Sequence, residues 1–161
     1  MLHDFLIAVH TVGGAAAFLL GFFVIHPLCR GRRGVFLAYF VGLWVMALTL
    51  VPVVWLDWPH LSLASRITYV FLILLALYTG LRGELARRVR GADDVRGRYA
   101  YVDHVGFTLI SLFDGFVIVS AIVLGVPGWL VGVAGALGVV VGVAALRRFQ
   151  SMWAGGRAGA G

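Results

Sequence analysis

Five long apolar segments, separated by short polar stretches, dominate the hydrophobic pattern of this chain. Each holds roughly 20 residues with almost no charge, the length that a helix needs to cross a bilayer core about 30 Å thick. The pattern therefore predicts an all-α, polytopic integral membrane protein, a bundle of five transmembrane helices forming a single domain over residues 1–150. The predicted spans are residues 5–25, 35–56, 63–81, 104–124 and 129–146.

The composition agrees with this fold class. Hydrophobic residues make up 61% of the chain and charged residues 12%, and the mean hydropathy is +1.00, which is far from the balance of a water-soluble domain. The first span has no basic residue before it and is longer than a signal-peptide core, so we expect it to be retained. Residues 151–161, rich in glycine and alanine, are predicted to be a flexible cytoplasmic tail.

The arginines predict the orientation of the bundle. Lysine is absent, and every arginine except Arg66 follows the first, third or fifth span. By the positive-inside rule that side is cytoplasmic, so the N-terminus is expected outside and the C-terminus in the cytoplasm. The expected location is the cell membrane, a bacterial or archaeal inner membrane. Aromatic residues agree, with Trp55, Trp58 and Trp129 at the outer boundary and Tyr78, Tyr99, Tyr101 and Trp153 at the inner one.

The distribution of charge and of small residues indicates which partners to expect. The net charge of +6 does not indicate nucleic acid, because the arginines flank apolar segments and form no continuous patch with aromatics. The bilayer is the expected partner. Small-residue stripes predict close helix packing, either within the chain or with a second copy or another membrane protein. The stripes are Gly13, Ala17 and Gly21 in the first span, and Gly128, Gly132, Ala136, Gly138 and Gly142 in the fifth.

Polar residues inside the spans are the candidate site, because they are costly in a bilayer. Asp114 lies near the middle of the fourth span. Projection at about 1.5 Å per residue places His10, Thr49 and Arg66 at comparable depth in the outer half of the first three spans. If Arg66 pairs with Asp114, these side chains and Ser111 form an outer-half pocket for a ligand or a proton.

A different arrangement of the same residues is also open. Arg66 can extend outward to the headgroups near Asp57, while Asp114 bonds a neighbouring helix. The pocket favours a transport, sensing or proton-handling protein over an enzyme. Sequence motifs agree with this preference, since no nucleophile elbow, zinc-protease motif or phosphate loop occurs and the single cysteine forms no internal disulfide.

Histidines suggest a second chemistry. His26 and His104 both fall at the inner boundary and could ligate one haem b between the first and fourth spans, because paired imidazoles hold haem in membrane b-type cytochromes. Histidines at such a boundary also serve as plain headgroup contacts. A haem-binding redox or haem-handling protein is therefore an alternative function. A membrane scaffold or assembly subunit, suggested by the glycine stripes, is another.

Overall fold

The computed structural model describes residues 1–26, 32–92 and 94–155, with side chains up to Gln150. These residues form helices and no strand, which confirms the all-α fold class. Five helices are long and apolar enough to cross a membrane, as expected for a multi-pass membrane protein. They are α1 (Leu2–Ile25), α2 (Arg33–Asp57), α3 (Leu63–Val89), α4 (Val95–Val123) and α5 (Gly128–Gly155), with a short 3₁₀ helix η1 (Trp58–His60) between α2 and α3.

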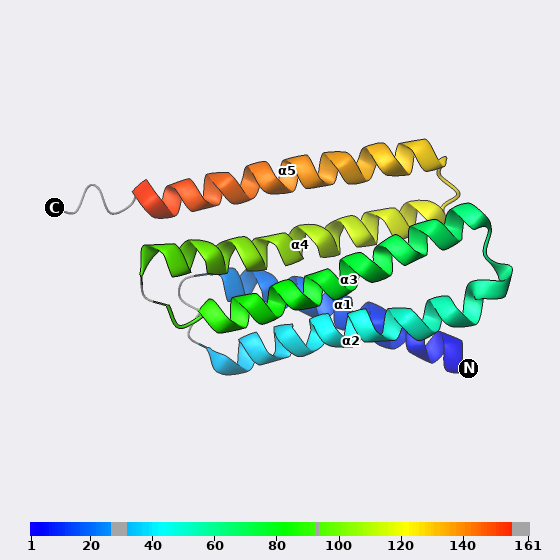
Figure 1. Cartoon of the computed structure of the whole chain (residues 1–161), viewed down its shortest axis with the longest axis horizontal. Helices are drawn as coiled ribbons and strands as arrows, with labels where there is room; N and C mark the ends of the chain where they lie inside the picture. The colour runs from blue at the N-terminus through cyan, green and yellow to red at the C-terminus, as the bar shows by residue number, and fades with distance from the viewer. Residues whose placement is uncertain (27–31, 93, 156–161) are drawn as a thin grey trace.

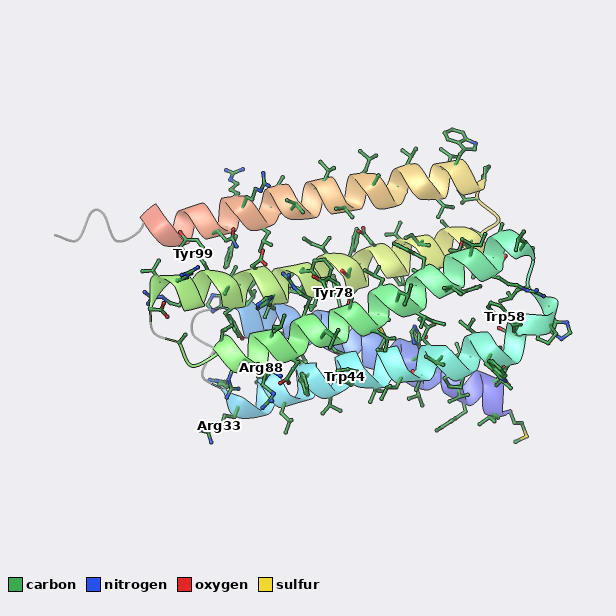
Figure 2. All side chains as sticks on the ribbon, viewed as in Figure 1. Arg33, Trp44, Trp58, Tyr78, Arg88 and Tyr99 are labelled. Atoms are coloured by element: carbon green, nitrogen blue, oxygen red, sulfur yellow. The ribbon has the colours of Figure 1, made fainter. Side chains whose placement is uncertain are left out.

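The five helices run side by side, and each reverses the direction of the one before it (Figure 1). One end of the bundle holds the N-terminus, η1 and the turn at Gly125; we call it the η1 end. The opposite end holds the start of α2, the end of α3 and the start of α4, where Figure 2 shows Arg33, Arg88 and Tyr99; we call it the arginine end. Trp58 lies at the η1 end in the same view.

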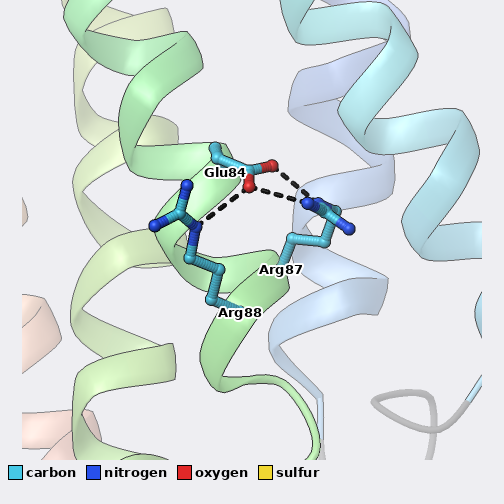
Figure 3. Close-up of polar contacts among 3 residues, drawn as sticks. All are labelled: Glu84, Arg87 and Arg88. Atoms are coloured by element: carbon cyan, nitrogen blue, oxygen red, sulfur yellow. Dashed lines mark hydrogen bonds and ion pairs between the residues drawn. The ribbon is translucent and has the colours of Figure 1, made fainter.

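Helices continue beyond the predicted spans at the arginine end. The segment 82–98, which lies between two predicted spans, is helical up to Val89 and again from Val95. Glu84 accepts hydrogen bonds from Arg87 at 2.6 and 2.7 Å and from Arg88 at 3.0 Å (Figure 3). Such pairs three and four residues apart support a helix in water, so α3 does not need an apolar environment here. Helix α5 likewise continues to Gly155; residues 156–161 of the predicted tail lie outside the described residues.

The most extensive helix contact joins α1 and α2. Gly13 and Gly42 face each other so closely that a Cβ at Gly42 would lie 2.9 Å from the carbonyl oxygen of Gly13. Ala17, next along the α1 stripe, is completely buried. Gly21 continues the stripe against Tyr39 of α2 and Leu109 of α4. The first small-residue stripe therefore packs within the chain.

Two buried tyrosines hold the arginine end together. The hydroxyl of Tyr39 on α2 hydrogen-bonds to Oγ1 of Thr108 on α4. Tyr101 of α4 donates to the carbonyl oxygen of Val24 at 3.0 Å, which satisfies one of the free carbonyls at the end of α1. Tyr101 is only 1% exposed, so it is a core residue and not the boundary aromatic that its position suggested. These bonds connect α1 and α2 to α4.

Among the described residues, helix α5 contacts this core through Leu146 and Phe149, which are only partly buried. It lies at the edge of the bundle beside α4 (Figure 1). Of its described side chains only Val131 is buried, whereas seven residues of α2 are. The interior that positions a site is therefore formed by α1 to α4.

Candidate functional site

A cavity of about 570 Å³ lies among α1, α2, α3 and α4, between the middle of the bundle and the η1 end. The tyrosine contacts at the arginine end lie outside it, and residues on all four helices form its wall. Apolar side chains make up most of this wall. Its polar members are His10, Thr11, Thr79, Ser111 and Ser120.

His10 is held by the backbone of α2. Its Nδ1 lies 2.9 Å from the carbonyl oxygen of Met46. A carbonyl oxygen only accepts hydrogen bonds, so Nδ1 carries the proton and donates. Thr49 donates from Oγ1 to the same oxygen at 3.2 Å and to that of Val45 at 2.6 Å. The close approach of α1 to α2 at Gly13, three residues after His10, makes this contact between helices feasible.

The remaining polar atoms of the cavity are neutral. Thr79 donates its hydroxyl to the carbonyl oxygen of Leu75 at 2.8 Å. Ser111 is nearly buried on α4, and Ser120 lies further along the same helix. Of the described residues that line the cavity, none is an acid, a lysine or an arginine. An ion bound there would lose its hydration without a counter-charge, so the cavity suits an uncharged molecule.

The cavity opens sideways between α1 and α4. Leu19 of α1 and Phe116 of α4 line it and are 61% and 71% exposed on the outer surface of the bundle. The opposite wall, with Leu72 and Ala76 of α3, is buried. Because the exposed side of a membrane helix faces lipid, this mouth would open into the hydrocarbon layer.

Asp114 and Arg66 lie apart from the cavity and from each other. The guanidinium of Arg66 sits 5.3 Å from the ring centroid of Trp58 at the η1 end. Asp114 is buried between α4 and α5, and its Oδ1 has no hydrogen-bond partner among the described residues. Oδ1 lies against the backbone of Gly138, where any Cβ would overlap it. The described side chains therefore show Arg66 reaching outward and Asp114 facing a neighbouring helix.

Two of the five predicted pocket residues, His10 and Ser111, do meet at one cavity. Thr49 is linked to His10 through the shared carbonyl of Met46. Asp114 follows Ser111 by three residues, which rotates it about 60° around α4 toward α5. Position along a helix holds no information on the direction in which each side chain points, so it could not place Asp114 and His10 relative to one another.

The two histidines considered for haem occupy different surroundings. His26 is exposed at the C-cap of α1. His104 is partly buried near Arg82, and Nη2 of Arg82 donates to Oδ2 of Asp103 at 2.5 Å. The Nδ1 atom of His104 is buried and has no hydrogen-bond partner among the described residues. Neither histidine lines the cavity. Over the described part of the chain, no three His, Cys, Asp or Glu residues come together as metal ligands.

A second hollow lies between α1, α4 and α5. It has a volume of about 800 Å³ and is lined almost throughout by apolar side chains, among them Phe22, Leu109 and Leu137. Glycines of α5, including Gly138 and Gly142, form its far side. It contains no histidine, hydroxyl or charged group among the described residues, so the first cavity is the better candidate for a specific ligand.

Comparison with protein families, with characterised proteins and with solved structures found nothing that matches this chain. The geometry defines a class all the same: a small helical bundle of membrane type with a cavity that opens at its surface and has no charged group among its described lining residues. Its distinctive chemical group is an imidazole whose Nδ1 is committed to a backbone carbonyl.

Proposed function

We propose that this protein crosses the membrane five times and binds a neutral, lipid-soluble molecule in the cavity among α1 to α4, as a carrier or sensor of that molecule. The observation that carries the proposal is the cavity itself, with His10 on its wall and its mouth between Leu19 and Phe116. A ligand that enters from the hydrocarbon layer must be soluble there. Transport or sensing was also the function expected from the sequence, but there the site included the charged pair Arg66 and Asp114. In the present proposal the polar groups of the site are His10 and Ser111.

The orientation is part of the proposal. The arginine end faces the cytoplasm and the η1 end faces outward, because arginines are retained on the cytoplasmic side. A cysteine introduced at exposed His60 in a Cys29→Ser background should react with a membrane-impermeant maleimide in intact cells. A cysteine at exposed Arg88 should react only after lysis. Labelling of Arg88→Cys in intact cells, with His60→Cys labelled only after lysis, would show the opposite orientation.

Filling the cavity tests ligand binding. Ala76 is 7% exposed and lines the cavity, so Ala76→Phe should occupy the space that a ligand needs. Leu74 lies on the same helix and is 61% exposed on its outer face, which makes Leu74→Phe a matched control. After purification in detergent, organic extraction and mass spectrometry should find a neutral apolar compound with the wild type and with Leu74→Phe. Its amount should fall severalfold in Ala76→Phe.

A second variant distinguishes a filled cavity from a misfolded protein. Ala15 lines the cavity from the exposed side of α1, so Ala15→Trp should block the mouth without entering the core. Both cavity variants should melt within a few degrees of the wild type. Equal amounts of every extracted compound in the wild type and in both folded cavity variants would refute the proposal.

A further inference from the structure

The hydrogen-bonding roles of His10 determine what a ligand must offer. Nδ1 donates to the carbonyl oxygen of Met46, and no acid or other charged group lines the cavity among the described residues. An imidazolium would be uncompensated there, so the ring is neutral and its other nitrogen, Nε2, carries only a lone pair. No described residue hydrogen-bonds to Nε2. A ligand that meets His10 must therefore present a donor, an O–H or an N–H.

Aromatic side chains line the wall beside the mouth. Phe18, Phe113 and Phe116 all contribute to the cavity, and the rings of Phe18 and Phe113 stack with their centroids 6.4 Å apart. Aromatic rings favour offset-stacked and edge-to-face neighbours, so this wall suits a further ring. On α4 the hydroxyl of Ser111 can either donate to or accept from a second polar group of that ring.

We infer that the cavity selects a ring lipid with a free hydroxyl, an alkylated phenol or hydroquinone. Its O–H donates to Nε2 of His10, its ring packs against Phe18 and Phe113, and its alkyl chain leaves through the mouth beside Phe116. The oxidised carbonyl form and the methyl ether lack the donor and bind more weakly. This inference rests on the proposed function and names the ligand class of the same cavity.

The probe pair is para-nonylphenol and its methyl ether para-nonylanisole, which share the ring and chain and differ in the donor. Binding to the purified, full-length protein is measured by equilibrium dialysis at constant detergent, with empty micelles subtracted. The wild type should bind the phenol about tenfold more tightly than the ether, the size of effect expected for one hydrogen bond in an apolar site. Nitrogen NMR should show the Nε2 resonance of His10 shifting with the phenol only.

His10→Asn is the informative variant. The asparagine amide can still donate to the carbonyl of Met46, as Nδ1 does, but nothing replaces Nε2. This variant should remain folded and bind both probes with the weaker affinity of the ether. His3→Asn is the matched control, because His3 lies on the same helix at the η1 end, where its Nε2 hydrogen-bonds to Asp57 at 3.0 Å. It should keep the tenfold preference.

The outcomes separate the two proposals. Equal binding of phenol and ether by the wild type, abolished by Ala76→Phe, would overturn the hydroxyl inference and support the cavity. A preference that survives in His10→Asn would overturn the role of His10. Binding of both probes that does not change in folded Ala76→Phe and Ala15→Trp would overturn the proposed function itself.

Discussion

The seam between α1 and α2 and the seam between α4 and α5 both contain glycine, but they use it differently. At the first seam backbone meets backbone, with Gly13 and Gly42 in direct contact. At the second, side chains of α4 enter spaces over glycines of α5: Asp114 lies against Gly138 and Ile110 against Gly142. The first seam positions His10 on Met46, and the second encloses the Asp114 carboxyl, whose Oδ1 has no hydrogen-bond partner among the described residues.

The difference teaches that a small-residue stripe does not by itself define one kind of interface. Backbone contact is rigid, since neither helix can move away without losing the whole seam. A side chain seated over a glycine can change rotamer, so the α4–α5 seam should tolerate more change. Substitutions at the two seams are therefore expected to differ in cost.

Gly42→Val should have the largest effect. Its Cβ would lie 2.9 Å from the carbonyl oxygen of Gly13 and 3.2 Å from the Cβ of Ala17, and neither group is flexible. Overpacking of this kind costs about 3 kcal/mol, which lowers the melting temperature of a chain this size by roughly 10 °C. Gly34→Val on the same helix, where no atom of the described residues lies within 4 Å of the added Cβ, is the control. Equal melting temperatures in detergent would contradict a rigid α1–α2 seam.

Gly138→Ala should have a smaller effect, and one that depends on Asp114. The added methyl overlaps Oδ1, so we expect a loss of about 1–2 kcal/mol as the carboxyl is displaced. In an Asp114→Ala background the same change should be neutral or stabilising, because alanine favours a helix over glycine by about 1 kcal/mol. Gly132→Ala, which meets nothing within 4 Å, should behave alike in both backgrounds. The melting curves of the wild type, Gly138→Ala, Asp114→Ala and the double variant test this contact. If the two single substitutions change the melting temperature additively, Gly138 and Asp114 are not in contact.

The smallest expected effects on stability come from removing two tyrosine hydroxyls of α4, one bonded to α1 and the other to α5. Tyr101 donates to Val24 of α1 at 3.0 Å, whereas Tyr99 donates to Gln150 of α5 at 3.4 Å. Tyr101→Phe leaves a buried carbonyl unsatisfied and should cost about 1–2 kcal/mol. Tyr99→Phe breaks a longer, half-buried bond and should change the melting temperature less. A larger shift for Tyr99→Phe would mean that α5 is held as firmly as the core.

Several features were readable before any tertiary contact was known. The all-α class and the five apolar helices follow from runs of apolar residues of bilayer length, a local property of the chain. Each predicted span overlaps one helix of the structure. The polar residues His10 and Ser111 were also identified, because a polar group in an apolar run is conspicuous without any structure.

Other features depended on neighbours far away in the chain. Tyr101 is a core residue because α1 ends beside it, and nothing near it in sequence indicates that. The ion pair of Arg82 with Asp103 joins α3 to α4 and was not anticipated either.

The sequence by itself determined which five apolar segments are helical and where each polar residue lies along them, because apolar length and a rise of about 1.5 Å per residue are local quantities. Only the tertiary structure decided the rotation of each helix. That rotation is set by packing at Gly13, Gly42 and Gly138, and it turns His10 and Ser111 toward one cavity and Asp114 toward α5.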